Sequence, residues 1–435
     1  MPEPATQTAI PKRSLAGWLE YIEALHPKSI AMGLERVSQV KERLKLTPLF
    51  PIIIVAGTNG KGSTCAMLER IYLEAGYRVA CYSSPHLLHY NERIRVDCKN
   101  AVDEDLVLAF ETVEAARHDT QLTYFEYGTL AAMRHFMDAD VDLAILEVGL
   151  GGRLDAVNAF EPSCSIVTSI DLDHIEFLGN SRESIGFEKA GIFRNNIAAI
   201  YGDTAPPVSL LQHAKEVGAP LKVITKDFNG ELNAELNGNS WVYHGPQLKI
   251  ADLPLPALFG SFQISNAACA ITAINELQSR LPVNEAAIVA GLENVKLAGR
   301  FQSFATTPPV ILDVAHNPHA AQALAASLHS SRIAGRTLAV FSMLADKDIA
   351  GVIKAIGNEI NSWYVANIAN VRGAPAGQLA DVIRLEHPES TIAAFDSVTD
   401  AYHQACLEAH ENDRIVVMGS FFTVAEIMPY LLKST

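Results

Sequence analysis

Short runs of apolar, β-branched residues recur along the chain and constrain its fold more than any other feature. The first of them occupy residues 51–56, 78–83, 142–148, 164–170 and 196–201. Each run is apolar on both faces, which is typical of a strand in a parallel sheet covered by helices on both sides. Segments with helical periodicity separate them. The first half of the chain is therefore expected to form an α/β domain with a mainly parallel sheet.

The second half of the chain repeats this alternation after an interruption. Residues 228–253 alternate loosely between polar and apolar side chains around Asn-Gly and His-Gly-Pro breakers. This pattern predicts a small antiparallel meander appended to the main sheet. Two helices are expected next, near 263–279 and 284–293. Further strands are then predicted at 309–315, 336–344, 362–368, 390–395 and 413–420.

The chain length also favours two domains, because 435 residues exceed what one ordinary hydrophobic core accommodates. We place the boundary where the alternation restarts, so that residues 1–297 form a large N-terminal α/β domain and residues 298–435 a smaller C-terminal one. A ligand is expected in the cleft between them, at the carboxyl ends of the strands.

Composition excludes several classes of protein. The net charge is −15, from 34 Lys and Arg against 49 Asp and Glu, which argues against a protein that coats nucleic acid or an anionic membrane. The six cysteines form no CxxC pair, so reduced, buried thiols of a cytosolic protein are expected. Prolines and charges near the start argue against a signal peptide. The apolar runs are shorter than the roughly 20 residues of a membrane helix. We therefore expect a cytoplasmic protein.

A glycine-rich loop, GTNGKGST at residues 57–64, follows the first predicted strand and precedes a helical segment. Glycines allow successive backbone N–H groups to point at one anion, and the positive end of the helix dipole adds to the attraction. Lys61 would bring a full charge to the β- and γ-phosphates of a nucleotide. The hydroxyl of Ser63 or Thr64 could complete a magnesium shell. The loop therefore predicts phosphate binding.

This loop is a variant of the standard phosphate loop. The standard spacing has a glycine where Val55 stands, and a hydroxyl directly after the lysine, where Gly62 stands. The alternative interpretation is an ordinary glycine-rich turn between a strand and a helix. The lysine and both hydroxyls favour phosphate binding over that alternative.

Two further strands of the first half end in polar residues. Glu147 ends one of them, where a buried carboxylate is costly unless it meets a cation such as magnesium. Asp171, Asp173 and His174 follow the next. A loop histidine is often only a surface or capping residue. Beside a glutamate and a triphosphate loop, however, an imidazole can serve magnesium while phosphate and carboxylate fill the remaining positions.

The second half has a similar polar set. Asp313, His316 and Asn317 follow a predicted strand, and Pro318 opens a helix, which is a common position for proline. Such a set is expected to face a ligand. Lys189 lies on a mostly apolar helical face, from which a lysine usually extends its amine to water.

Taken together, these motifs and their order resemble the folylpolyglutamate synthase family, in particular its bacterial bifunctional dihydrofolate synthase/folylpolyglutamate synthases, which group with the Mur ligases. The resemblance extends from about residue 15 to the end of the chain. The motifs that carry it are AGTNGKGST, SSPHL, TYFEYGT, LEVGLGGRLDA, SIDLDHIEFLG, EKAGIF and LDVAHNPHA.

The resemblance implies an ATP-dependent ligase that joins L-glutamate to dihydropteroate and adds further glutamates to reduced folates through an acyl phosphate. The larger domain would be the ATP-binding one, and two magnesium sites are implied. The implied ATP-binding residues are Gly57, Thr58, Asn59, Gly60, Lys61, Gly62, Ser63, Thr64, Asn266, Arg300 and Asp313. The implied metal-binding residues are Ser63, Glu147, His174 and Lys189, the last as a carbamate formed with carbon dioxide. Catalytic roles are implied for Lys61, Lys189, Asp313 and His316.

The same resemblance implies a pterin or folate site. Its implied residues are Ser83, Pro85, His86, Thr123, Phe125, Asp155 and Ala156. Two positions depart from the family pattern. Phe262 stands where relatives carry a histidine, which affects the expected adenine contact, and Ala298 stands where proline is usual, which affects hinge stiffness.

Two alternatives remain open. Within the family, the protein could have only the chain-extending activity, although TYFEYGT and Asp155 favour a dihydropteroate pocket by resemblance. In another class, it could be a nucleotide-binding switch that senses ATP without ligation, against which the second polar set at Asp313, His316 and Asn317 argues. The expected partners are small molecules (ATP, L-glutamate, dihydropteroate and reduced folates), with no nucleic acid and no membrane, acting on a monomer.

Overall fold

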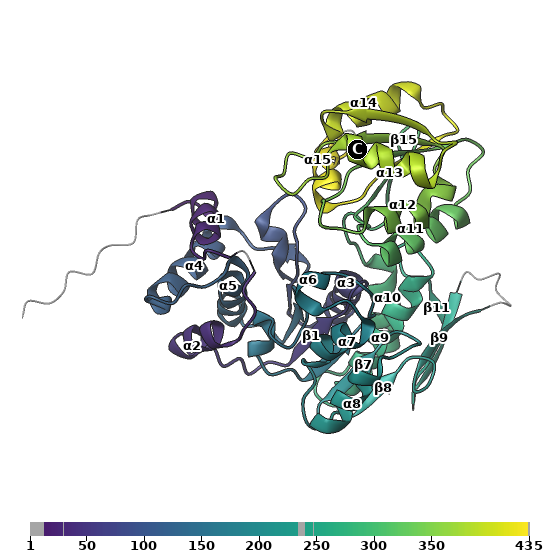
Figure 1. The fold of residues 1–435 in the computed structure, drawn as a ribbon. Coiled ribbons are helices and arrows are strands. Elements are labelled where there is room, and N and C mark those ends of the chain that lie inside the picture. The colour runs from purple at the N-terminus through teal and green to yellow at the C-terminus, as the bar shows by residue number, and fades with distance from the viewer. Residues whose placement is uncertain (1–12, 29, 234–239, 247, 434–435) are drawn as a thin grey trace, which may run out of the picture.

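The protein folds into two α/β parts, one built by the first two thirds of the chain and one by the last third (Figure 1). The computed structural model describes residues 13–28, 30–233, 240–246 and 248–433. The expected α/β fold class, with a mainly parallel N-terminal sheet and a separate C-terminal α/β part, is confirmed. The predicted boundary at residue 298 falls between α10 (Glu285–Asn294) and β12 (Gln302–Phe304) and stays a prediction.

The N-terminal sheet has eight strands among the described residues, in the order β4-β3-β2-β5-β1-β6-β7-β8. Six of them are parallel, whereas β3 and β4 form an antiparallel edge that the sequence patterns did not reveal. The strands are β1 (Ile52–Ala56), β2 (Val79–Tyr82), β3 (Ile94–Val96), β4 (Lys99–Asn100), β5 (Leu143–Glu147), β6 (Cys164–Val167), β7 (Ala198–Tyr201) and β8 (Leu221–Val223).

Helices cover both faces of this sheet, which explains why its strands are apolar throughout. Alternate residues of β1 belong to two separate cores: Ile52 and Ile54 pack with α1, α2, α4, α5, α7 and α8, whereas Ile53 and Val55 pack with α3, α9 and α10. The helices are α1 (Leu15–Ala24), α2 (Glu35–Arg43), α3 (Lys61–Glu74), α4 (Asp103–Arg117), α5 (Tyr124–Asp138), α6 (Ile175–Leu178), α7 (Arg182–Ala190), α8 (Val208–Val217), α9 (Phe262–Glu276) and α10 (Glu285–Asn294).

The predicted meander is present, but it forms a separate sheet instead of extending the main one. Among the described residues it contains the strands β9 (Asn229–Leu232), β10 (Ser240–His244) and β11 (Lys249–Pro254), paired antiparallel in the order β11-β10-β9. Trp241 and Tyr243 of β10 are fully buried against the same core as α9. Part of the predicted segment, residues 234–239 and 247, lies outside the described residues.

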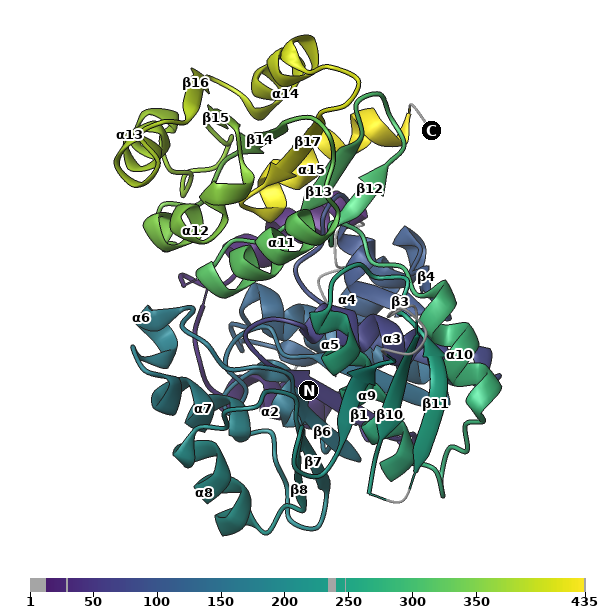
Figure 2. The same cartoon turned by 90° about the vertical axis from the view of Figure 1, so that its right-hand side faces the viewer.

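The C-terminal part has its own sheet, whose order among the described residues is β12-β13-β17-β14-β15-β16. All neighbours are parallel except β12 and β13. Its strands are β12 (Gln302–Phe304), β13 (Val310–Asp313), β14 (Thr337–Phe341), β15 (Ser362–Ala366), β16 (Thr391–Phe395) and β17 (Arg414–Met418). Its helices are α11 (Pro318–Ser330), α12 (Ile349–Ile356), α13 (Ala376–Glu386), α14 (Val398–Glu408) and α15 (Phe421–Leu432). The turned view in Figure 2 places α11 at the junction with the N-terminal part.

No helix among the described residues is both long and apolar enough to cross a membrane. The cysteines are free, as predicted, and Cys65, Cys81, Cys164 and Cys269 are buried. The expectation of burial is wrong for Cys98 and Cys406, which are exposed.

Close packing of α10 on α3 supports the helix that follows the glycine-rich loop. A Cβ added to Gly291 of α10 would lie 2.7 Å from the Cα of Ile71 in α3, so the two backbones would have to separate. We expect Gly291→Ala to lower the free energy of unfolding by about 1–3 kcal/mol through overpacking. Thermal denaturation measures this. Gly377→Ala in α13 is the matched control, because nothing lies within 4 Å of its added Cβ, and equal destabilisation by both changes would contradict the packing argument.

Candidate active site

The glycine-rich loop has the backbone geometry that an anion site needs. Gly57 and Gly60 have φ values of 148° and 87°, which side-chain-bearing residues rarely adopt. A Cβ on Gly57 would collide with Thr168, and a Cβ on Gly60 would lie 2.5 Å from Oδ1 of Asn266. Helix α3 begins directly afterwards, at Lys61, so its free N–H groups face the loop. The predicted loop and the predicted Asn266 are therefore brought together.

Two lysines converge on this loop from different elements. Lys61 Nζ donates to the Gly57 carbonyl at 3.0 Å, and Lys189 Nζ of α7 donates to the same carbonyl at 2.9 Å. The expectation that Lys189 extends to water is wrong, because the residue is only 4% exposed. Burial, together with the charge of Lys61, lowers the pKa of Lys189 to about 7. A substantial fraction of this amine is therefore neutral at physiological pH.

The residues predicted to hold a metal, Ser63, Glu147 and His174, line one cavity with the loop. Burial raises the pKa of Glu147, whose carboxylate accepts a hydrogen bond from the Ser84 backbone N–H at 3.2 Å. Burial lowers the pKa of His174 to about 4, so its imidazole is neutral at pH 7 and able to ligate. The described residues contain no group of three or more His, Cys, Asp or Glu side chains placed to hold a metal. The donor set fits an ion whose remaining ligands come from nucleotide phosphates.

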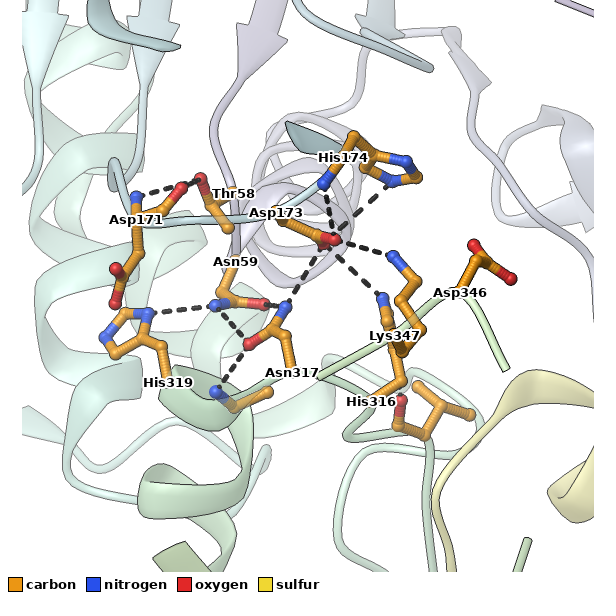
Figure 3. A network of polar contacts seen from close by, with 12 residues as sticks. Thr58, Asn59, Asp171, Asp173, His174, His316, Asn317, His319, Asp346 and Lys347 are labelled. Carbon is orange, nitrogen blue, oxygen red and sulfur yellow. Dashed lines mark hydrogen bonds and ion pairs between the residues drawn. The ribbon is translucent and has the colours of Figure 1, made fainter. Parts of the chain in front are cut away.

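Asp173 connects the two parts of the protein (Figure 3). Its Oδ1 accepts from Lys347 Nζ at 2.6 Å, and its Oδ2 accepts from Asn317 Nδ2 at 3.3 Å. Nε2 of His316 lies 3.8 Å from Oδ2. Burial alone would raise the pKa of Asp173, but His174, Lys347 and His316 together lower it. The carboxylate is thus ionised at neutral pH and faces three residues of the C-terminal part.

A second contact joins the glycine-rich loop itself to α11. Asn59 Nδ2 donates to Asn317 Oδ1 at 3.2 Å, and Asn317 Nδ2 donates to Asn59 Oδ1 at 3.1 Å. His319 Nδ1 lies 2.8 Å from Asn59 Nδ2. Asn317 also caps α11 by accepting from Ala320 N–H, so its amide is fixed at the helix start. The phosphate loop and the C-terminal part are therefore in direct contact.

The other predicted residues of the C-terminal part surround the same cavity. Asp313 ends β13, and its two oxygens accept from the backbone N–H groups of Phe301 and Ala315, both at 2.8 Å. His316 Nδ1 lies 2.9 Å from the Val314 carbonyl, and burial lowers the His316 pKa to about 4. Arg300 lies over the ring of Phe421. Asp313 therefore fixes the backbone around Arg300 and His316 in addition to facing the cavity.

The cavity has a volume of about 800 Å³ and extends from the glycine-rich loop to the predicted pterin residues. Pro85, His86, Thr123, Phe125, Asp155 and Ala156 all line it. Burial raises the pKa of Asp155 to about 7. Two predicted residues do not line the cavity. The Ser83 hydroxyl instead accepts from Arg95 at 3.1 Å, and the Thr64 hydroxyl is buried without a hydrogen-bond partner among the described residues.

Sequence patterns missed Lys347, His319 and Arg93, which also line the cavity. Lys347 follows β14 in the stretch MLADKD, and the rule that drew attention to Asp313, a polar residue after a C-terminal strand, applies to it equally. His319 lies within the motif that contains His316. Arg93 gives no comparable signal, because it belongs to a short 3₁₀ helix, η1 (Tyr90–Arg93), before the antiparallel strand β3.

Comparison with known proteins agrees with this geometry. A model of the Mur ligase middle domain matches residues 55–274, and a model of the Mur ligase glutamate ligase domain matches residues 299–421. The dihydrofolate synthase/folylpolyglutamate synthase of Escherichia coli (strain K12) is 45% identical over 415 residues, which cover 95% of this chain and 94% of that protein. The chain belongs to the dihydrofolate synthase/folylpolyglutamate synthase family. The resemblance inferred from its motifs is confirmed.

Solved structures of this family have the same fold over almost the whole chain. Escherichia coli FolC in complex with DHPP and ADP has a TM-score of 0.91 at 43% identity, covering 97% of this chain and 98% of that one. The bifunctional folylpolyglutamate synthase/dihydrofolate synthase of Yersinia pestis, complexed with AMPPNP and a Mn ion, has a TM-score of 0.90 at 43% identity, covering 98% and 100%.

The contacts of Asp173 are expected to hold the two parts of the ligand-free protein together. Asp173→Asn keeps the shape of the side chain but leaves the Lys347 side chain, 9% exposed, without its counter-charge. We expect this change to weaken the interface by about 1–3 kcal/mol and to open the protein. Small-angle X-ray scattering should show a larger radius of gyration.

The control is Asp346→Asn, which removes the neighbouring, more exposed ion pair with Arg372. That pair lies within the C-terminal part, so its loss should leave the radius unchanged. The lowered pKa of Asp173 adds a pH test. The stabilisation is present above the ordinary carboxyl pKa of about 4 and is lost as pH falls through the lower folded value. An unchanged radius of gyration in Asp173→Asn would contradict the role of Asp173 in holding the two parts together.

Proposed function

We propose that this protein is an ATP-dependent ligase that joins L-glutamate to dihydropteroate and adds further glutamates to reduced folates. The observation that carries the proposal is one continuous cavity that joins a cationic phosphate loop to an aromatic-lined end beside Asp155. Relatives support it. Escherichia coli FolC was solved with DHPP and ADP, and another structure, 43% identical, with Mn, AMPPNP and L-glutamate.

The chemistry requires activation of a carboxylate, because its oxygen is a poor leaving group. Transfer of the γ-phosphoryl group of ATP to the carboxylate of the acid gives an acyl phosphate, and two anions must meet for this. Lys61, the loop N–H groups and the start of α3 are positioned to offset that charge. Arg300 and Asn266 are the remaining residues that we assign to ATP.

The amine of glutamate then attacks the acyl carbon, loses a proton and displaces inorganic phosphate as the C–O bond to the phosphate breaks. His316 is suited to accept that proton. Its Nδ1 lies against the Val314 carbonyl, so a proton on Nδ1 leaves a lone pair on Nε2, which lies 3.8 Å from Asp173 Oδ2 in the cavity wall. The lowered pKa keeps this ring neutral at pH 7, so that Nε2 can accept a proton. The contacts of Asn59 with Asn317 bring the two parts of the protein together at the phosphate loop, and exclusion of water there would protect the intermediate from hydrolysis.

Metal binding is assigned to Ser63, Glu147 and His174 at one site and to a carbamate of Lys189 at a second. Bound magnesium would supply charge stabilisation on the transferring phosphoryl group. Only the neutral form of an amine adds carbon dioxide, and the lowered pKa of Lys189 favours that form. We also retain the predictions of a monomeric, cytoplasmic protein that binds no nucleic acid.

Substrate-dependent ATP turnover tests the proposal. Phosphate release should require both L-glutamate and either dihydropteroate or tetrahydrofolate. If L-glutamate supports turnover with tetrahydrofolate but not with dihydropteroate, the protein has the chain-extending activity only. Lys61→Ala should lower kcat by about 100- to 1,000-fold, since it removes charge stabilisation of the transferred group. Lys215→Ala, an exposed lysine of α8, is the control and should retain activity. Turnover that needs neither acid would contradict the proposal.

The carbamate has a separate test. Because the pKa of Lys189 is about 7, its neutral fraction rises between pH 6 and pH 8, and carbamate occupancy should rise with it. With ¹³C-labelled bicarbonate, ¹³C NMR of the ligand-free enzyme should show a carbamate carbon that increases over this range. Lys189→Gln should abolish the signal. Absence of the signal in the wild type at pH 8 would overturn the assignment.

A further inference from the structure

A buried acidic residue at the start of α5 has a role that phosphate or metal binding does not explain. Glu126 is 3% exposed, and it lies between Thr123 and the rest of α5 as part of a capping box. Its Oε2 accepts from the Thr123 backbone N–H at 2.7 Å, while the Thr123 hydroxyl accepts from the Glu126 N–H at 3.2 Å. The carboxylate therefore fixes the first turn of α5, which carries Phe125 into the cavity wall.

The partner of this carboxylate comes from a different element. Arg36, in the first turn of α2, donates from Nη2 to Glu126 Oε1 at 2.9 Å and from Nε to Oε2 at 3.2 Å. The Arg36 side chain is 28% exposed and that of Glu126 only 4%, so the carboxylate of the pair is buried, at the wall of the cavity that Glu126 lines. A bidentate, charge-assisted pair of this kind fixes both distance and angle between α2 and α5.

Arg36 also holds the segment that precedes α2. Its Nη2 donates to the Ala31 carbonyl at 2.6 Å. Residues 30–33 line the cavity, and the Gly33 N–H donates to the Leu154 carbonyl at 3.3 Å, next to Asp155. One guanidinium therefore ties residues 30–33 to the turn that carries Phe125.

Residues 30–33 and the first turn of α5 both pack against the loop that follows β5. The Phe125 ring lies 2.7 Å from the position of a Cβ on Gly149, and the Met32 terminal methyl lies 3.4 Å from that of a Cβ on Gly151. Phe125, Met32 and residues 149–151 are thus walls of one end of the cavity, the end that holds Asp155.

We propose that Arg36 and Glu126 are positioning residues that set the width of the aromatic end of the cavity and thereby the affinity for a planar aromatic acid, without contacting ATP. The proposal rests on the proposed function and adds two residues and a specificity role to it. Lysine should not replace arginine fully, because a single ammonium group lacks the planar fork that reaches two carboxylate oxygens and a carbonyl together.

The experiment compares Arg36→Gln and Arg36→Lys with Arg117→Gln. Arg117 is the matched control. It pairs with Glu114 through two bonds of 2.7 Å on α4, and neither residue lines the cavity. We expect Arg36→Gln to raise the KM for dihydropteroate by about 10- to 100-fold, because it removes the charge-assisted hydrogen bonds to Glu126. Arg36→Lys should be intermediate, and kcat and the KM for ATP should stay near wild type, because the lost interaction affects ground and transition states alike.

The outcomes separate this proposal from the function on which it rests. Wild-type enzyme that shows no pterin-dependent turnover would contradict the function, whatever Arg36 does. Normal wild-type turnover with equal KM values in Arg36→Gln and Arg117→Gln would overturn the positioning role. A fall in kcat with unchanged KM would also overturn it. Should Arg36→Gln fail to fold, Arg36→Lys decides by the same comparison, since an unchanged KM in a folded Arg36→Lys refutes the need for the guanidinium fork.

Discussion

Two amines directed at one backbone carbonyl are the interaction on which the rest of the site depends. Lys61 and Lys189 both donate to the Gly57 carbonyl, and all three residues line the cavity. Burial and the nearby charge of Lys61 lower the pKa of Lys189, so part of the repulsion between the two amines is relieved by loss of a proton. A phosphate bound at the loop would favour the protonated amines instead. The loop can therefore bind an anion through local geometry, in a protein whose net charge is −15.

Contacts between the two parts of the protein bring residues of the C-terminal part to the phosphate loop. Asp173 meets Lys347, and Asn59 meets Asn317, so the phosphate loop is touched by the element that carries His316. Phosphoryl transfer to a carboxylate needs such an arrangement, because the intermediate must be kept from water until the amine arrives. Arg36 and Glu126 shape the opposite end of the same cavity. The two ends of one cavity are thus suited to separate tasks, binding of the acid and activation of its carboxylate.

The sequence predicted those features that depend on residues close together in the chain. The apolar runs predicted the parallel strands except β8, and the glycine pattern predicted a loop whose positive φ angles at Gly57 and Gly60 only glycine adopts readily. It failed where a contact depends on packing. The antiparallel edge strands β3 and β4 are too short to give a periodic signal, and Lys347 lies 174 residues from Asp173. Neither Ser83 nor Thr64 faces the cavity, because a hydroxyl in a motif can turn to either side of its backbone.

The sequence by itself determined the fold class, the phosphate loop and the family, because each rests on residue types at fixed short spacings. Only the tertiary structure decided the state of Lys189, which local pattern places in water and packing encloses beside Lys61. It alone also decided which of the strand-end polar residues meet. Burial and proximity are properties of the whole packed chain, and they set the pKa values and contacts on which the chemistry depends.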